Sequence, residues 1–165
     1  MSNEQIEFAD FFEASWVPCL RAVMAVAGDS QLAEDQVAEA FARAFASWRK
    51  VSRHPAPRAW VVRTALNTGV SWWRRRSREL PLGGHDVMVP DDPGEGGDAA
   101  VLTALRRLPG RQREVIVLRV LLDLDVGTIA RELGIAPATV RVHLARGVAA
   151  LRHQFVPDTT TEVNR

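Results

Sequence analysis

VGTIARELGIAPATVRVHLARGVAALR, residues 126–152, reads as two short helices joined by a tight turn. Apolar residues recur at helical spacing up to Leu133, and Gly134 then supplies the left-handed conformation that commonly ends a helix. Pro137 suits the first turn of the next helix, because an amide there has no intrahelical partner to lose. This order of signals predicts a helix-turn-helix.

The second helix of this motif has two different faces. One is an apolar stripe that we expect to be buried, made of Val140, Leu144, Val148, Leu151 and Phe155. The opposite face carries Thr139, Arg141, Val142, Ala145 and Arg146. The functional interpretation is a recognition helix in the DNA major groove, with Arg141 and Arg146 reaching bases or phosphates. The alternative is an ordinary helical hairpin with solvated arginines, since the motif also occurs without nucleic acid.

The composition indicates a globular protein of one ordinary domain or two small ones. Of 165 residues, 47% are hydrophobic and 25% are charged, which is typical of soluble proteins. No apolar run approaches the length of a membrane span, and the N-terminus lacks a basic-then-apolar signal segment, so we expect a cytoplasmic protein with no membrane insertion of its own. The single cysteine, Cys19, cannot form an internal disulfide and fits a buried position in a reducing compartment.

The formal net charge of +1 conceals four blocks of alternating sign. Residues 1–39 hold eight acids and one base, and residues 40–78 hold ten bases and no acid. Residues 79–98 hold six acids and no base, and residues 99–152 hold nine bases and four acids. Two basic blocks separated by an acidic one suggest two contacts with a polyanion.

The periodicity along the chain predicts an all-α protein of two small helical domains. Helices are expected at residues 5–27, 31–50, 57–78, 99–108 and 111–122, before the helix-turn-helix. Pro18 should bend or interrupt the first of them. The domains are expected at 5–78 and 99–155, and the tail 156–165 is expected to be disordered.

Residues 79–98, ELPLGGHDVMVPDDPGEGGD, separate these two domains. Five glycines, three prolines and six acids in this stretch predict a flexible acidic linker and not a packed element. Such a linker permits both a compact arrangement, with acidic and basic faces paired, and an open one.

Two features of the first domain are candidates for binding. Asp35, Glu39 and Arg43 stand at i, i+4 and i+8 and form an exposed ridge, which is either a docking face for another protein or a self-paired salt ridge. The basic loop 51–57, VSRHPAP, leads into a helix in which tryptophans alternate with arginines. Such residues can stack on unpaired bases while following a phosphate backbone; alternatively, the tryptophans are core residues and the arginines are solvated.

These pieces together resemble the bacterial sigma factors of the extracytoplasmic-function (ECF) type over about residues 7–153. The resemblance is carried by AEDQVAEAFARAF at 33–45, AWVVRTALNTGVSWWRRR at 59–76 and LPGRQREVIVLRVLLDLDVGTIARELGIAPATVRVHLARGVAALR at 108–152. SWWRRR is similar to a subgroup common in actinobacteria. The resemblance implies that a region-two domain docks on core RNA polymerase and melts the proximal promoter element, and that a region-four domain reads the distal element. It implies core polymerase and promoter DNA as partners; many members are also held by an anti-sigma factor.

The resemblance also implies roles for individual residues. Asp35 and Glu39, with Arg43 on the same ridge, match the polymerase-docking surface, although Ala38 stands where the family usually has Gln. Loop 51–57 matches the base-capturing loop in position, and Asn67 matches a helix Asn that can hydrogen-bond a flipped base. The residues expected at the proximal element and single-stranded DNA are Arg53, His54, Arg58, Arg63, Asn67, Trp72, Trp73, Arg74 and Arg75.

For the distal element, the expected contacts are Arg111, Arg113, Thr139, Arg141, Val142, His143, Ala145 and Arg146. His143 stands where Arg is more usual and Val142 where Ser is common, which implies an altered distal sequence preference. The acidic linker matches, in position, the segment that threads the polymerase cleft.

Two other classes of function compete with this interpretation. A stand-alone helix-turn-helix regulator would usually carry a sensor or dimerisation domain, and the basic, Trp-rich first domain fits that role poorly. An enzyme has no support: the four histidines are scattered, no glycine loop that would cradle phosphate precedes a helix, and no Ser-His-acid arrangement can be proposed. We therefore expect neither a metal nor a cofactor.

Overall fold

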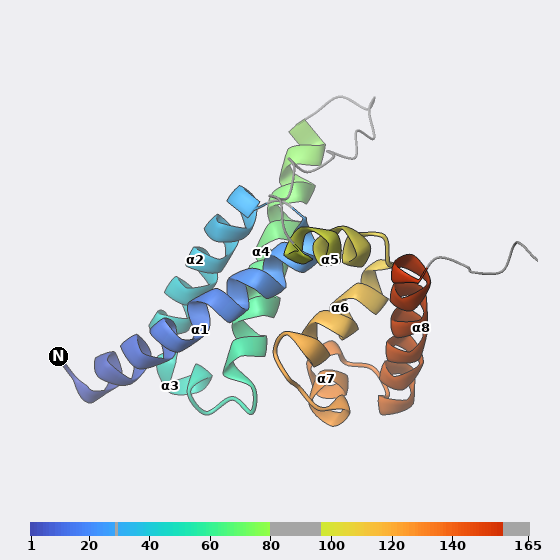
Figure 1. The fold of residues 1–165 in the computed structure, drawn as a ribbon. Coiled ribbons are helices and arrows are strands. Elements are labelled where there is room, and N and C mark those ends of the chain that lie inside the picture. Colours follow the sequence, from blue (N-terminus) through green and yellow to red (C-terminus); the bar gives the residue numbers. More distant parts are fainter. Residues whose placement is uncertain (29, 80–96, 157–165) are drawn as a thin grey trace, which may run out of the picture.

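In the computed structural model, the described residues are 1–28, 30–79 and 97–156; for residues 30, 70–79, 97 and 98 the description is limited to the backbone. Every regular element within these ranges is a helix (Figure 1). In chain order they are α1 (Asn3–Ala27), α2 (Ser30–Ala46), α3 (Trp48–Val51), α4 (Pro57–Glu79), α5 (Gly97–Arg106), α6 (Gly110–Val120), α7 (Val126–Leu133) and α8 (Pro137–Phe155). The all-α prediction is confirmed. The predicted linker lies almost wholly outside the described residues, as does the predicted tail beyond residue 156.

The first module, α1–α4, is built on three long helices, with α1 crossing both α2 and α4 (Figure 1). Its core contains Val23, Val37, Phe41 and Val61, which are almost completely buried. Cys19 is also buried, as expected, and burial raises the pKa of its thiol to about 12. These side chains come from α1, α2 and α4, so the three helices share one core, whereas Phe12 and Phe45 are 39% and 50% exposed.

Helix α1 continues through Pro18, so the interruption considered for that residue does not occur. A proline has no amide hydrogen, and the carbonyl of Ala14, four residues earlier, loses its usual donor. Arg58 of α4 replaces that donor: its Nη2 donates to the Ala14 oxygen at 2.8 Å and its Nε to the Ser15 hydroxyl at 3.0 Å. The helix stays intact because a neighbouring helix satisfies the freed carbonyl.

Helix α2 ends at Ala46, and not near residue 50 as the spacing predicted. The chain turns at Ser47 and starts the short α3, which places the buried Trp48 ring 5.3 Å from Phe8 and 5.1 Å from Phe11, between ring centroids. Aromatic pairs at such separations are favourable beyond their burial alone. The break therefore turns Trp48 back into the core of the module.

The second module, α5–α8, contains the predicted helix-turn-helix. Asp125 caps α7 by accepting a hydrogen bond from the Thr128 amide at 2.8 Å. Gly134 adopts φ of +65°, and Pro137 stands in the first turn of α8. These three features confirm the predicted helix-turn-helix.

The predicted buried stripe of α8 is wrong at two positions, because Val148 and Phe155 are 38% and 52% exposed. Gly147 is buried instead, and a Cβ added there would lie 2.9 Å from Cγ1 of Ile116. Helix α8 thus packs closely on α6 at Gly147, and Val148, the next residue, is on the exposed side. The stripe predicted from spacing is displaced by this close approach.

Helix α7 should become less stable when Asp125 is changed to Ala, with a dependence on pH. The hydrogen bonds from Thr128 hold the pKa of the Asp125 carboxyl below its ordinary value. Its contribution is therefore present above the unfolded pKa of about 3.9 and is lost as the pH falls through the lower folded pKa. Thermal unfolding followed by circular dichroism should show a lower Tm for D125A at pH 7, and the difference from wild type should shrink in acid. An equal deficit at all pH values would contradict this; D125N, which keeps an uncharged acceptor, is the control.

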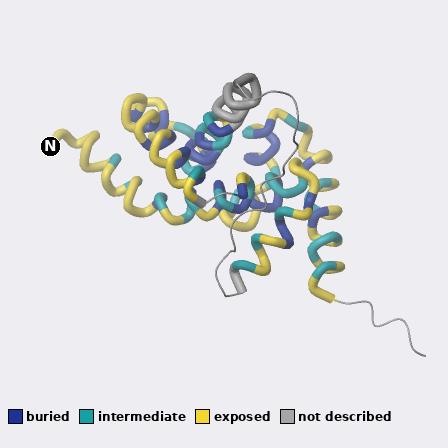
Figure 2. Tube along the Cα trace, turned by 90° about the horizontal axis from the view of Figure 1, so that it is seen from above, coloured by how far each residue is buried: buried dark blue, intermediate teal, exposed yellow. Residues whose placement is uncertain are grey.

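The two modules pack against each other, with α1 lying on α5 and α6 (Figure 1). Buried side chains gather where helices face one another, and the N-terminal turns of α1 are exposed (Figure 2). The compact arrangement left open by the sequence is the one observed. The modules meet mainly through packing of these helices and not through pairing of acidic with basic faces. Within the described ranges, no helix has both the length and the apolarity needed to cross a bilayer.

Candidate polymerase and nucleic-acid interface

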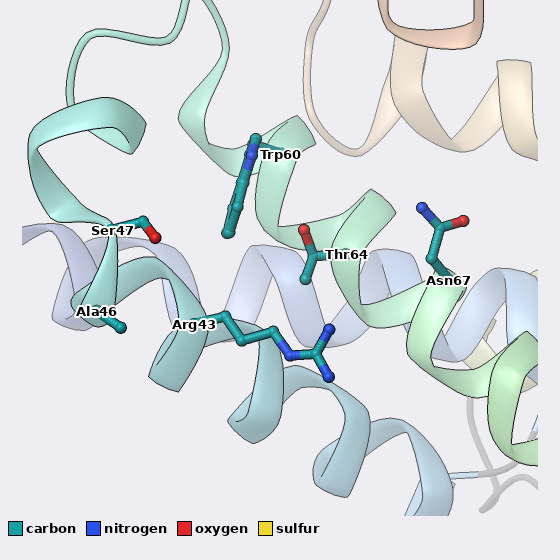
Figure 3. Close-up of a pocket in the computed structure, with 6 residues that line it drawn as sticks. All are labelled: Arg43, Ala46, Ser47, Trp60, Thr64 and Asn67. Carbon is teal, nitrogen blue, oxygen red and sulfur yellow. The ribbon is translucent and has the colours of Figure 1, made fainter.

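A shallow pocket of about 440 Å³ lies between the end of α2 and the first turns of α4 (Figure 3). Its lining consists of Arg43, Ala46, Ser47, Trp60, Thr64 and Asn67. The Arg43 side chain extends from α2 toward Thr64 on α4 (Figure 3). The pocket combines a cation, an aromatic ring and an amide, which are the groups that bind an unpaired nucleotide.

The predicted docking ridge, Asp35–Glu39–Arg43, lies on the exposed side of α2. The Arg43 Nε donates to a Glu39 carboxylate oxygen at 2.8 Å, and both side chains are about half exposed. Exposed pairs of this kind contribute little to stability. Because Arg43 also lines the pocket, the docking ridge and the predicted single-strand site are contiguous.

The residues predicted for the proximal element do not all lie together. Asn67 is exposed at the pocket, Arg53 is exposed in the loop after α3, and Arg63 is half-buried on α4. Arg58 is engaged by Ala14 and Ser15 as described above. Trp72, Trp73, Arg74 and Arg75 follow on the same helix α4, but their side chains lie outside the described part.

His54 contacts the second module. Its Nδ1 accepts a hydrogen bond from the Ala56 amide at 3.0 Å, and its Nε2 lies 3.2 Å from a carboxylate oxygen of Glu132 on α7. A residue predicted for the base-capturing loop is therefore held against the first helix of the helix-turn-helix.

The distal set is mostly on one open surface. The residues predicted for the outer face of α8 are all exposed: Thr139, Arg141, Val142, Ala145 and Arg146. His143 is half-buried, and its Nδ1 is buried without a hydrogen-bond partner. Arg111 is exposed and pairs with Glu114 at 3.0 Å. This surface leaves Arg141 and Arg146 pointing away from the module core.

Arg113 is the member of the distal set that the structure uses differently. Its guanidinium donates to the carbonyl oxygens of Leu105, Arg106 and Leu108, and to that of Val26 in the first module, at 2.8–3.0 Å. Burial lowers the pKa of Arg113 from its ordinary value. In this conformation its donors are occupied by carbonyls at the ends of α1 and α5 and are not directed at a phosphate.

Four residues of the pocket lining are not among the residues predicted to bind: Ala46, Ser47, Trp60 and Thr64. Trp60 belongs to the helix in which tryptophans alternate with arginines, and Thr64 has no predicted role. Trp60, Thr64 and Asn67 stand at i, i+4 and i+7, which is one face of a helix. Because Asn67 was predicted, the same helix face could have indicated Trp60 and Thr64. That Arg43 of α2 lies beside them depends on helix packing and could not be predicted from this face.

Comparison with known proteins identifies both modules. Residues 16–79 match the family model described as Sigma-70 region 2, and residues 98–151 match Sigma-70, region 4. An RNA polymerase sigma-E factor of Streptomyces antibioticus is 30% identical over 160 residues, covering 93% of this chain and 87% of the relative. The chain belongs to the sigma-70 family. The sigma-E factor of Streptomyces coelicolor is 29% identical to this sigma factor over 157 residues, covering 93% and 89% of the two chains.

The fold of this sigma factor also matches a solved one. The sigma factor RpoE of Bartonella quintana, crystallised in complex with the anti-sigma factor NepR, gives a TM-score of 0.69 at 22% identity. The match covers 90% of this chain and 98% of that chain. At this identity the likeness supports the fold of two helical modules. Among the described residues, no group of histidine, cysteine and acidic side chains has the arrangement of a metal site.

Proposed function

We propose that this chain is an ECF-type sigma factor that binds core RNA polymerase and directs promoter recognition, melting and the start of transcription. The observation that carries the proposal is the joint presence of region two and region four over most of the chain, with an exposed basic recognition helix in the second. In this proposal the chain acts by binding and makes or breaks no covalent bond. The free energy comes from phosphate contacts and from stacking of unpaired bases.

The first module supplies the polymerase contact and the single-strand site in this proposal. Asp35 and Glu39 present carboxylates on the exposed side of α2, where a basic surface of the polymerase can meet them. The adjacent pocket accepts an unpaired base, with Trp60 offering a ring face and Asn67 an amide that can read a base edge. The contiguity of ridge and pocket places melted DNA beside the polymerase surface.

We further propose that the chain divides as residues 5–78, an acidic linker 79–98, residues 99–155 and a tail 156–165. The family matches at 16–79 and 98–151 support these boundaries. We also propose that the chain acts in the cytoplasm, where the polymerase and the promoter are.

The second module reads the distal element through α8. Changing Arg141 or Arg146 to Ala should each weaken binding to a promoter that this sigma factor transcribes by about tenfold, because a contact to a base edge or phosphate is lost. Arg152→Ala is the matched control, since Arg152 is exposed on the last turn of the same helix. Footprinting of the polymerase complex should show lost protection at the distal element with R141A or R146A. Equal losses in all three variants would indicate a general charge effect and contradict the assignment.

The proposal as a whole is tested with core RNA polymerase. The purified chain should co-elute with core enzyme in gel filtration and should direct run-off transcription from specific start sites on genomic fragments. Co-elution without any change in start sites would contradict a role in promoter selection. Specific operator binding without polymerase, together with no co-elution, would support a stand-alone regulator instead.

A further inference from the structure

The contact between His54 and Glu132 joins the loop predicted to bind single-stranded DNA to the first helix of the helix-turn-helix. His54 belongs to the loop 51–57 of the first module, and Glu132 belongs to α7 in the second. The Nε2 and Oε1 atoms are 3.2 Å apart, and the side chains are 25% and 11% exposed. A carboxylate this well covered needs a donor, because burying it unpaired is costly.

The loop itself fixes how His54 makes this contact. Because the Ala56 amide donates to Nδ1 at 3.0 Å, Nδ1 carries no hydrogen in this geometry. The hydrogen of the neutral ring is then on Nε2, the atom that lies 3.2 Å from the Glu132 carboxylate oxygen. The loop backbone therefore orients the imidazole so that Nε2 faces the Glu132 carboxylate.

A second contact holds the same arrangement at the other side of the interface. Val26 is in the last turn of α1, and Leu105 and Arg106 are in the last turn of α5, where carbonyls lack the usual intrahelical donors. Arg113 donates to all three, so one guanidinium caps helices from both modules. The Leu105 oxygen also accepts from the Leu108 amide at 3.1 Å. A cation at two helix C-termini is also favoured by the helix dipoles. The two modules are thus joined by specific polar contacts as well as by apolar packing.

From this geometry we infer that Glu132 acts as an intramolecular competitor of nucleic acid for the loop 51–57 in the free chain. A phosphate or base that approaches His54 meets the Glu132 carboxylate already 3.2 Å from Nε2, and the negative charge repels the phosphate backbone. The loop binds DNA only in the fraction of molecules in which α7 has moved away. The apparent affinity is reduced by that fraction. This inference rests on the proposed function, because it requires that loop 51–57 binds DNA.

The test is the affinity of the free, full-length chain for a fluorescein-labelled single-stranded oligodeoxythymidylate, measured by anisotropy at low salt. E132A should raise the affinity about fivefold, because the competing acceptor is removed. E114A is the matched control: it removes one carboxylate from the same module, and within the described residues Glu114 pairs only with nearby Arg111. The gain from E114A should be less than twofold. Equal gains would mean a net-charge effect and would overturn the inference.

A double-mutant cycle with His54 shows whether Glu132 acts through that residue. In an H54A background, E132A should give no greater gain than E114A gives there, because the donor it competes for is absent. An undiminished gain in that background would overturn the inference. Should circular dichroism show that E132A is unfolded, E132Q and E114Q replace the pair, with the larger gain expected for E132Q. If no variant binds the oligonucleotide, the masking role is refuted, whereas the polymerase experiment above decides the proposed function separately.

Discussion

Replacing Arg113 with methionine is expected to lower the free energy of unfolding by about 3 kcal/mol, the largest effect on stability that we anticipate. Methionine keeps much of the length and apolar stem of the side chain but removes every donor. The four carbonyl oxygens that Arg113 now serves are those of Leu105, Arg106, Leu108 and Val26. An acceptor left without a partner in a partly buried site costs about 1–3 kcal/mol. The Leu105 oxygen keeps the Leu108 amide as a donor at 3.1 Å, and water can reach some of the others, so that the sum is only partly realised.

Arg111 provides the control for this experiment. It lies two residues away on α6, is exposed and pairs only with Glu114 in the described structure. Arg111→Met should therefore change the free energy of unfolding by less than about 0.5 kcal/mol. Urea unfolding followed by circular dichroism measures both variants. A similar small effect for R113M would show that the carbonyl contacts contribute nothing.

The sequence was sufficient to predict the helices and the turn of the second module. Gly134 and Pro137 act locally: one supplies a positive φ, the other starts a helix without loss of a hydrogen bond. Apolar spacing likewise placed α1 and α4 to within a few residues. Local signals of this kind depend on neighbours along the chain, and they can therefore be read without knowing the fold.

Features that depend on contacts between distant segments were missed. Arg58 fills the gap left by Pro18 only because α4 lies beside α1. Val148 is exposed because α8 approaches α6 at Gly147, a crossing point that periodicity does not specify. Arg113 was expected to reach phosphate, since nothing near it in the sequence reveals the carbonyl of Val26, 87 residues away.

The candidate site shows the same division. Asn67 and the ridge on α2 could be proposed from a family resemblance and from helical spacing. The pocket itself needs Arg43 from α2 beside Trp60 from α4. It therefore depends on how those two helices pack, and the sequence alone could not place the docking ridge next to the single-strand site.

Reversing the charge of the docking ridge, with Asp35→Lys and Glu39→Lys together, should have the largest effect on function. We expect at least a tenfold loss of affinity for core RNA polymerase and a corresponding loss of run-off transcription, because lysines would face the basic surface proposed to bind the ridge. Both residues are exposed on α2, so the fold should be retained. Gel filtration with core enzyme, or competition against the wild-type chain, measures the affinity.

A matched control separates this effect from a change in net charge. Glu7 and Asp10 are exposed on α1 and belong to no predicted contact, so that Glu7→Lys with Asp10→Lys changes the net charge by the same amount elsewhere. This control should bind core polymerase within about twofold of wild type, because exposed charges outside a contact act mainly through long-range and salt-screened terms. The ridge variant should also retain binding to distal-element duplex DNA through α8, since that surface is untouched. If the control loses as much polymerase affinity as the ridge variant, the ridge is not the docking surface; if the ridge variant loses duplex binding as well, misfolding explains the loss.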